Sequence, residues 1–494
     1  MSLSKFSLSL KSRAVVVFTC AALAQVAAAE DPLIPGRMVI ETLSAKQRAR
    51  FVASFSAQFG APISVDSIPT TGWELLGYIL PRGHSTAEVE LFLENAVLAG
   101  ELQSGELDYE GSSGEGRTGS LWLSSLPIND LALENQYARD LLGLDAAWQR
   151  SMGAGVVIAI IDGGITPSHP ALGGRVAQWG VSMAPGEPLA DIGNGVDDDG
   201  DGLIDEQVGH GTFVAGLMHW VAPEALILPI RVLNSDGITS NFRTAKALQF
   251  ASSHGAHVIN LSLGSDYHSA AVQSMVELAV QNGAVVIAAA GNRDAEDPRE
   301  FPASDEACIG VAALDWIDVK APFSSFGEKL DLSAPGRSML VDGAPSAQFS
   351  VIGPVPNGIA VWEGSSFASA FVAGTAALVR AQHPTWPDEL VPNELIAQEV
   401  KAVLGSTGPN PDTTNPNYAG RLGTARVSAH GATSVAGVAP RLADLNADLR
   451  VGAADLTILL DMWGNGGFGL RADLNGDAVV GAADLSILLS GWNE

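Results

Sequence analysis

The hydrophobic positions between residues 136 and 436 form short, nearly uninterrupted runs that alternate with amphipathic stretches. Such runs are typical of strands that are buried on both faces of a parallel sheet. The stretches between them fit covering helices, so the alternation predicts an α/β domain with helices on both sides of a doubly wound parallel sheet. The predicted strands are 156–161, 227–232, 258–263 and 285–290, and the predicted helices are 241–254 and 270–282.

Residues 30–135 carry a second, smaller α/β pattern. A strand-like segment, 37–41, precedes two helical patterns, 44–59 and 85–99. The Gly- and Ser-rich segment 111–120 follows them, and its composition predicts an exposed connection that proteases can cut. A small N-terminal domain is therefore expected ahead of the larger one.

Residues 1–29 have the organisation of a secretory signal peptide. Basic residues precede an apolar run, 14–24, that is too short to span a bilayer, and small residues follow at 27–29. No later stretch is long and apolar enough to predict a transmembrane segment. We therefore expect a secreted or cell-surface protein.

The overall composition excludes some classes of protein. Hydrophobic residues make up 47% and charged residues 17%, which argues against global disorder. The net charge of -28 repels nucleic acid and attracts cations such as Ca²⁺, although a merely solubilising surface is the alternative. Cys308 is the only cysteine after the signal peptide, so no intrachain disulfide can form, and we expect a small buried side chain there.

Three polar residues stand where open α/β sheets place their chemistry, at strand ends and helix starts. Asp162 ends a buried strand, His210 lies between two glycines, and Ser366 precedes an apolar helical pattern. Taken singly, each has a structural explanation: a turn cap, an ordinary core histidine and a helix N-cap. Taken in this order, they can supply an orienting acid, a general base and a nucleophile.

The segments around these residues resemble the signatures of the subtilase (peptidase S8) family. They are Val-Ile-Ala-Ile-Ile-Asp-Gly-Gly, Gly-His-Gly-Thr and Gly-Ser-Ser-Phe-Ala-Ser, with further similarity at 221–225, 258–264, 289–292, 323–327 and 334–336. The resemblance covers about residues 136–436 and implies a subtilisin-like serine endopeptidase that hydrolyses polypeptides without a catalytic cofactor. It implies attack by Ser366, with His210 as base and Asp162 orienting it. Ser365 is a rival nucleophile, but the family has Thr at its position.

The resemblance also assigns residues around the substrate. Asn292 and the Ser366 N–H are the implied oxyanion donors. The implied pocket walls consist of small or apolar residues without a counter-charge, which predicts broad cleavage with a preference for large apolar side chains at the cleaved bond. These wall residues are Ser262, Leu263, Gly264, Ala289 and Gly291.

The chain departs from the family beside the predicted catalytic residues. Phe213 replaces a histidine, and Ala370-Phe371 replaces Pro-His. If these departures disrupt the site, the alternative is a catalytically inactive subtilase-like protein that binds within an extracellular assembly.

An acidic loop before His210 has the spacing of a calcium loop. Asp197, Asp199, Asp201 and Asp205 stand at positions 1, 3, 5 and 9 of an EF-type loop. Val208 occupies position 12, so the usual closing carboxylate is missing. We expect structural Ca²⁺ here, and a solvated acidic turn is the alternative.

The C-terminal segment is an internal repeat, because residues 444–463 and 473–492 agree at most positions. Both units carry oxygen ligands at positions 1, 3, 5 and 12 of a calcium loop. The pair resembles a type I dockerin module, which implies a cohesin-type partner; a calcium-stabilised cap without a partner is the alternative. The ligand candidates are Asp444, Asn446, Asp448 and Asp455 in the first unit, and Asp473, Asn475, Asp477 and Asp484 in the second.

Residues 30–135 occupy the place of a subtilase propeptide. Their pattern resembles the inhibitor-like fold of such propeptides, which implies a zymogen whose own propeptide is a binding partner. The cleaved bond is expected between residues 108 and 135, and a permanent N-terminal domain is the alternative. The expected domains are the signal peptide 1–29, the propeptide 30–135, the catalytic domain 136–436, and the linker with dockerin-like repeats 437–494.

Overall fold

A computed structural model describes residues 33–113, 122–123, 130–296, 300–341, 344–346, 348–388, 391–435, 445, 451–464, 472, 474 and 479–490. The predicted signal peptide lies outside these residues. Among the described helices, none combines the length and the apolar character that crossing a membrane requires.

The centre of the chain is a parallel sheet with the strand order β18-β13-β12-β11-β10-β6-β8-β7. All neighbouring pairs in this sheet run parallel. The four strands predicted from apolar runs are confirmed as β6 (Val157–Asp162), β8 (Leu226–Arg231), β10 (Val258–Leu261) and β11 (Val285–Ala289). The others are β7 (Val181–Ser182), β12 (Ile309–Leu314), β13 (Leu332–Pro335) and β18 (Ala425–Arg426).

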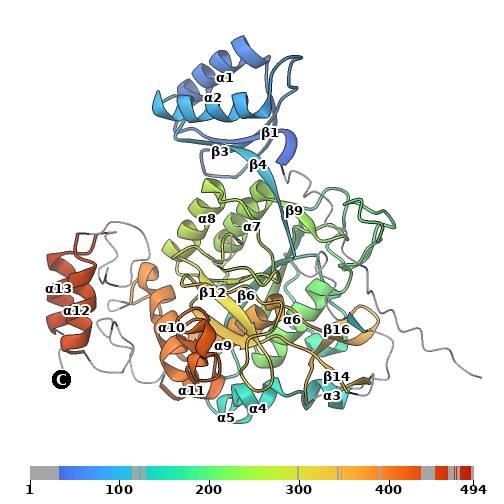
Figure 1. The fold of residues 1–494 in the computed structure, drawn as a ribbon, viewed down its shortest axis with the longest axis vertical. Coiled ribbons are helices and arrows are strands. Elements are labelled where there is room, and N and C mark those ends of the chain that lie inside the picture. The colour runs from blue at the N-terminus through green and yellow to red at the C-terminus, as the bar shows by residue number, and fades with distance from the viewer. Residues whose placement is uncertain are drawn as a thin grey trace, which may run out of the picture. The chain divides into compact units, whose positions relative to one another are not determined.

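Helices cover both faces of this sheet, as the alternation predicted (Figure 1). In β6, Ile158 and Ile160 pack into the apolar cluster of α6 (His210–Val221) and α9 (Ser365–Gln382). Ala159 and Ile161 face the other way, into the cluster of α7 (Asn241–Ser253) and α8 (Ala270–Gln281). Burial on both faces explains why the strand has no polar alternation.

The described C-terminal part of this domain contains two helices. α10 (Asn393–Thr407) is followed by α11 (Ala429–Val435). The Thr433 hydroxyl donates to the Ala429 carbonyl over 2.8 Å, as in a regular helix. Helix α11 ends before residue 437, where the linker is expected to begin. Cys308 is fully buried, as expected, and burial raises the pKa of its thiol.

The N-terminal domain is an antiparallel sheet with two helices on one face. Its strands are β1 (Leu33–Glu41), β2 (Ile63–Ser67), β3 (Trp73–Gly77) and β4 (Ser104–Ser112), in the order β2-β3-β1-β4. The two predicted helices are confirmed as α1 (Ala45–Phe59) and α2 (Thr86–Leu98), with Ser44 and Ser85 as N-caps. In β1, Met38 and Ile40 pack against these helices, whereas Val39 joins the apolar cluster of α7 and α8.

Strand β4 continues the N-terminal sheet into the catalytic domain. It pairs antiparallel with β9 (Ile238–Ser240), and Ser112 forms an antiparallel bridge with Gly264. Gly111 and Ser113 are buried, so the prediction of an exposed segment is wrong for residues 111–113. Residues 114–121 lie outside the described part of the chain.

Smaller elements complete the described structure. A three-stranded antiparallel sheet lies beside α6 and contains the aromatic side chain of Trp362. Its strands are β5 (Trp122–Leu123), β16 (Val351–Val355) and β17 (Gly358–Trp362). The remaining elements are α3 (Asp130–Glu134), α4 (Ala138–Leu142), α5 (Leu144–Trp148), β14 (Leu340–Val341), β15 (Ala344–Pro345), and the 3₁₀ turns Pro170–Leu172, Pro411–Thr413 and Pro416–Tyr418.

The C-terminal repeat folds as a pair of helices, α12 (Ala453–Asp461) and α13 (Ala482–Ser490). Leu459 and Leu488 occupy equivalent positions and are fully buried in a shared core. Six ligand candidates lie outside the described residues: Asp444, Asn446, Asp448, Asp473, Asn475 and Asp477.

Candidate active site

The structure brings Asp162 and His210 into direct contact at the carboxyl edge of the parallel sheet. Asp162 is the last residue of β6, and His210 is the first residue of α6. The His210 Nδ1 and Asp162 Oδ1 atoms are 2.8 Å apart. Both residues are at most 1% exposed, so the carboxylate orients the ring in a site that excludes water.

Aromatic rings connect His210 to the helix that carries Ser366. The ring centroids of His210 and Phe367 are 5.6 Å apart, and those of His210 and Trp362 are 5.5 Å apart. Phe213 packs on Phe367 at 4.5 Å and is fully buried. The departure from the family at Phe213 therefore supports the packing around the histidine.

Asp191 holds the start of α6 and was missed by sequence reasoning. Its carboxylate accepts hydrogen bonds from the N–H groups of Gly209 and Thr212, at 2.8 and 3.2 Å, and from the Thr212 hydroxyl. Gly209 has a φ of 104°, which a residue with a side chain rarely adopts. Burial raises the pKa of Asp191 to about 6 despite these donors. The loop before α6 thus fixes the position of His210.

Ser366 forms two reciprocal hydrogen bonds with Ser262, the residue that follows β10. Its Oγ donates to the Ser262 carbonyl over 3.2 Å, and the Ser262 Oγ donates to the Ser366 carbonyl over 3.1 Å. Asn260 donates to the Ser262 Oγ over 2.8 Å. Ser365, the rival nucleophile, accepts instead from the Gly291 N–H over 3.0 Å. The two serine hydroxyls therefore contact the segments that follow different strands, β10 and β11.

Asn292 follows β11 and lies beside the start of α9. Its Oδ1 accepts from the Ser365 N–H over 2.8 Å. This bond fixes which end of the amide accepts, so the NH₂ group is the donating end of the side chain. Asn292 is 4% exposed. The arrangement fits an oxyanion donor whose orientation is set by the backbone.

A carboxylate lies against both walls of the predicted specificity pocket. A methyl group built on Gly291 would meet the Glu300 Cδ at 2.0 Å, and one on Gly264 would meet its Cβ at 3.2 Å. Glu300 is 8% exposed. The expectation that no counter-charge faces these walls is therefore wrong. The other predicted wall residues, Ser262, Leu263 and Ala289, are buried.

The acidic loop forms two carboxylate clusters that share Asp199. One cluster contains Asp197, Asp199 and Asp236, and the other contains Asp199, Asp201 and Glu206; within each, oxygen atoms lie within 4.8 Å of one another. Both carboxylate oxygens of Glu206 are buried and have no hydrogen-bond partner in the described residues. Burial, reinforced by neighbouring carboxylates, raises the pKa of Glu206. Concentrated oxygen ligands of this kind suit a hard cation such as Ca²⁺.

Asp205 differs from the EF-type expectation. Its carboxylate accepts from the N–H groups of Asn194, at 2.8 Å, and Gly195, and it belongs to neither cluster. Asp236 and Glu206 take part instead, although the loop spacing gave no signal for them. Asp236 lies far along the chain and accepts from the Asp205 N–H over 2.7 Å.

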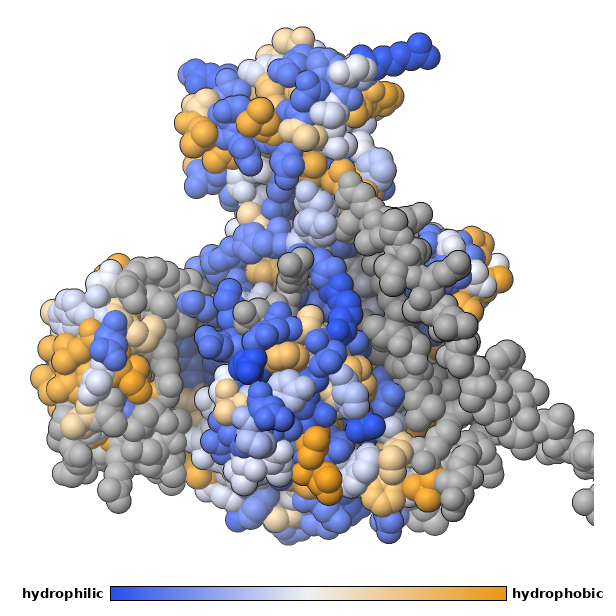
Figure 2. All heavy atoms as spheres, in the orientation of Figure 1, coloured by the Kyte–Doolittle hydropathy of each residue, from blue (hydrophilic) through white to orange (hydrophobic). Residues whose placement is uncertain are grey.

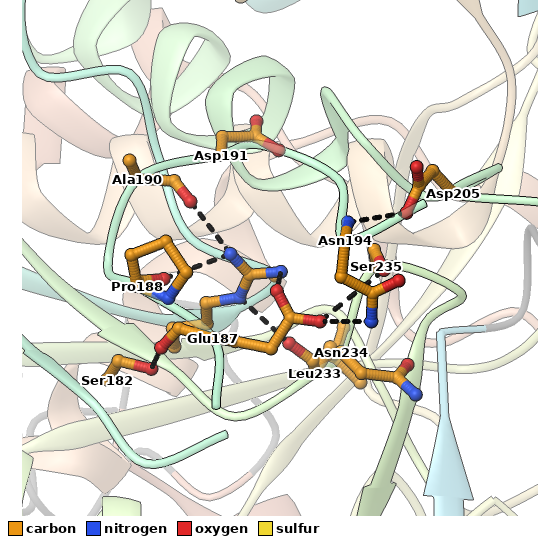
Figure 3. Close-up of polar contacts among 12 residues, drawn as sticks. Ser182, Glu187, Pro188, Ala190, Asp191, Asn194, Asp205, Leu233, Asn234 and Ser235 are labelled. Carbon is orange, nitrogen blue, oxygen red and sulfur yellow. Dashed lines mark hydrogen bonds and ion pairs between the residues drawn. The ribbon is translucent and has the colours of Figure 1, made fainter. Parts of the chain in front are cut away.

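A buried ion pair ties this loop to the central sheet (Figure 3). The Arg231 guanidinium lies 2.8 Å from the Glu187 carboxylate, and their side chains are 1% and 4% exposed. Arg231 also donates to the carbonyls of Pro188 and Ala190, over 2.9 and 2.7 Å. Glu187 accepts from the side chain of Asn194 over 3.0 Å. The acidic loop is therefore anchored to the end of β8, beside Asp162.

Two ligand candidates of the C-terminal repeat are described, and they occupy equivalent places. Asp455 accepts from the Gly452 N–H over 2.8 Å, and Asp484 accepts from the Gly481 N–H over 2.7 Å. Both are at most 1% exposed. Each carboxylate thus caps the first turn of its helix and is buried within its unit.

Comparison with known proteins identifies the family. Residues 153–438 match the subtilase family. Subtilisin BL from Lederbergia lenta is 35% identical over 272 residues, which cover 53% of this chain and 89% of the relative. Thermitase from Thermoactinomyces vulgaris is 33% identical over 247 residues, covering 50% of this chain and 82% of that protein.

Solved structures of other proteases support the α/β fold described above. Fervidolysin from Fervidobacterium pennivorans, a keratinolytic enzyme related to subtilisin, aligns with a TM-score of 0.61 at 20% identity, covering 81% of this chain and 61% of that one. A protease from Pseudoalteromonas arctica aligns with a TM-score of 0.50 at 26% identity, covering 62% and 99%. These similarities do not favour an inactive binding protein. The chain belongs to the subtilase family and is a serine endopeptidase.

Proposed function

We propose that the protein cleaves polypeptides through an acyl-enzyme formed on Ser366. His210 accepts the proton from the Ser366 hydroxyl as this oxygen attacks the peptide carbonyl, and it then donates the proton to the leaving amine. Asp162 holds the His210 ring in the required tautomer and stabilises its cation. The observation that carries this proposal is the buried 2.8 Å contact between His210 and Asp162, next to the helix that begins with Ser365 and Ser366.

The oxyanion of the tetrahedral intermediate takes donors from two elements. The Asn292 side-chain amide and the Ser366 N–H serve this role, and the N-terminus of α9 favours the same negative charge. The contact between Asn292 and Ser365 supports this assignment, since it fixes the amide before substrate arrives.

The N-terminal domain acts as a propeptide that blocks the cleft. Residues 110–113 lie as an extended strand between β9 and Gly264. Ser112 and Gly264 exchange N–H···O bonds of 2.8 and 3.0 Å, and the Ser113 N–H donates to the Gly237 carbonyl over 3.1 Å. An extended substrate would use the same backbone groups. We place the cleaved bond after residue 113 and before the catalytic domain.

Calcium stabilises the acidic loop. The residues that bind the ion are Asp197, Asp199, Asp201, Glu206 and Asp236. The buried oxygens of Glu206 support this ligand set. Bound there, the ion supplies positive charge that offsets the repulsion between the carboxylates; it has no part in the chemical step.

The C-terminal module tethers the secreted enzyme to a cohesin-type partner. Leu460 and Leu489 occupy equivalent positions in the two units and are 52% and 53% exposed. Figure 2 shows hydrophobic residues gathered over α12 and α13. A contiguous patch of exposed hydrophobic residues is typical of a binding surface. Calcium-dependent retention of the chain on a cohesin-type domain is the measurement that tests this tether.

The test of the catalytic assignment compares residues 30–494 with the same chain carrying Ser366→Ala or Ser365→Ala, each incubated with calcium. We expect the unchanged chain and Ser365→Ala to release the N-terminal domain and digest casein. Ser366→Ala should do neither, because its nucleophile is gone. Casein hydrolysis by Ser366→Ala at the unchanged rate would show that another residue attacks.

A further inference from the structure

We propose that Glu300 makes the pocket beside Ser366 select a lysine or arginine side chain at the residue whose carbonyl is attacked. This inference rests on the proposed function, because it concerns the substrate of the same site. It replaces the apolar preference, whose premise of an uncharged pocket does not hold.

The walls on which Glu300 lies are both joined to the nucleophile segment. Gly264 comes two residues after Ser262, whose carbonyl accepts from the Ser366 hydroxyl. The Gly291 N–H donates to the Ser365 hydroxyl. Because the Glu300 Oε2 would lie 2.2 Å from a Cβ atom built on Gly291 and 3.5 Å from one built on Gly264, the carboxylate lies between the two strand ends that flank Ser366.

Among the described residues that form ion pairs beside this pocket, carboxylates outnumber guanidinium groups. The Glu300 carboxylate lies 3.2 Å from the Arg293 guanidinium, which also forms an ion pair with Asp266. Within the described residues, the carboxylates of Glu300 and Asp266 thus share this one guanidinium. The Arg293 side chain is 46% exposed, whereas that of Glu300 is 10% exposed. A cation that enters the pocket meets a buried carboxylate whose present partner can move into solvent.

The side chains that a substrate could place in this pocket differ in the free energy of their contact with Glu300. A large apolar side chain would exclude water from the Glu300 carboxylate and give it no new partner, which is unfavourable. A small side chain would leave the carboxylate as it is and gain little. The stem of a lysine or arginine can pass between Gly264 and Gly291 while its charged end pairs with Glu300. The basic side chain is the one that gains from this pocket.

The experiment uses the full chain after release of its N-terminal domain, with peptides that differ only at the residue before the cleaved bond: Arg, Lys, Phe, Leu or Ala. Glu300→Gln removes the charge at nearly constant shape, and Glu300→Ala also removes the bulk. Glu296→Gln is the matched control, since this acid lies in the same loop, is 59% exposed and pairs with Arg421. Titration with a serine-directed phosphonate gives the active fraction of every variant.

We expect kcat/KM for Arg and Lys to exceed that for Phe by about 10-fold or more in the unchanged chain. Glu300→Gln should lower the Arg and Lys values by about 10–100-fold and leave Phe within about 3-fold, while Glu296→Gln changes none of them. A preference for Phe, Leu or Ala, or an unchanged preference in Glu300→Gln, would overturn the inference while leaving the protease function intact. If no peptide is cleaved and the phosphonate does not label Ser366, the proposed function fails and the inference fails with it.

Discussion

At the scale of single residues, the hydrogen bonds around Ser366 determine which atoms of the neighbouring side chains accept and which donate. Asn292 is the sharpest case, because its Oδ1 accepts from the Ser365 N–H and its NH₂ group must then be the donor. Replacing Asn292 by Ala removes a donor that acts on the charge of the transition state. We expect kcat to fall by about 100–1,000-fold while KM changes little. Steady-state kinetics on a peptide substrate measure both.

The matched control for this prediction is Asn282→Ala. Asn282 is exposed and its side chain donates to the Ser252 hydroxyl over 2.9 Å, away from the site. This variant should keep the kcat of the unchanged enzyme. An increase of KM alone in Asn292→Ala would mean that the residue binds substrate and does not stabilise the oxyanion.

At the scale of elements, the acidic loop gives a prediction about calcium. In the Ser366→Ala chain that ends at residue 436, saturating calcium at about 100 times its Kd should add about 2.7 kcal/mol to the unfolding free energy, which raises the Tm of a chain of this length by about 3 °C. Asp199 belongs to both carboxylate clusters, so Asp199→Asn should abolish most of this increase. Thermal unfolding with calcium or a chelator measures it.

Asp198→Asn is the control within the same loop. The Asp198 carboxylate is exposed, accepts from the Asn194 side chain and lies in neither cluster. Its calcium-dependent increase in Tm should match that of the unchanged chain. If both variants lost the calcium-dependent increase in Tm equally, the increase would come from general screening of the negative charge and not from an ion bound at the clusters.

Elements were predictable from the sequence where the signal is local. The strand β6 is an uninterrupted apolar run, and α1 and α2 begin at serine caps, so neighbouring residues suffice to define them. The contacts of Asp236 with the acidic loop and of Glu300 with Gly264 join segments that are distant in the chain. Such contacts depend on how the elements pack, and no spacing rule in the sequence encodes them. The family motifs located Asp162, His210 and Ser366, whereas Asp191 had no motif to mark it.

At the scale of the whole molecule, the N-terminal domain is joined to the catalytic domain through carboxylates that cap helices. Glu106 accepts from the Ser269 hydroxyl over 2.6 Å and from the Ala270 N–H over 2.8 Å, at the start of α8. Asp108 accepts from the Phe242 N–H over 3.2 Å, at the start of α7. Burial raises the pKa of both, and that of Asp108 reaches about 6.

These raised pKa values make the contact between the domains depend on pH. When the cleaved N-terminal domain leaves, the Asp108 carboxyl returns to water and to an ordinary pKa of about 3.9. Between about pH 4 and pH 6 the bound form therefore holds more protons than the free form, so binding weakens as pH rises through this window and is constant above it.

We expect the inhibition constant of residues 30–113 toward the processed enzyme to rise by about 10-fold or more from pH 4.5 to pH 7. Asp108→Asn should flatten this rise, while Asp66→Asn, which removes an ion pair with Lys246 at the same interface, should weaken binding without flattening it. A rise that persists unchanged in Asp108→Asn would show that another group carries the pH dependence.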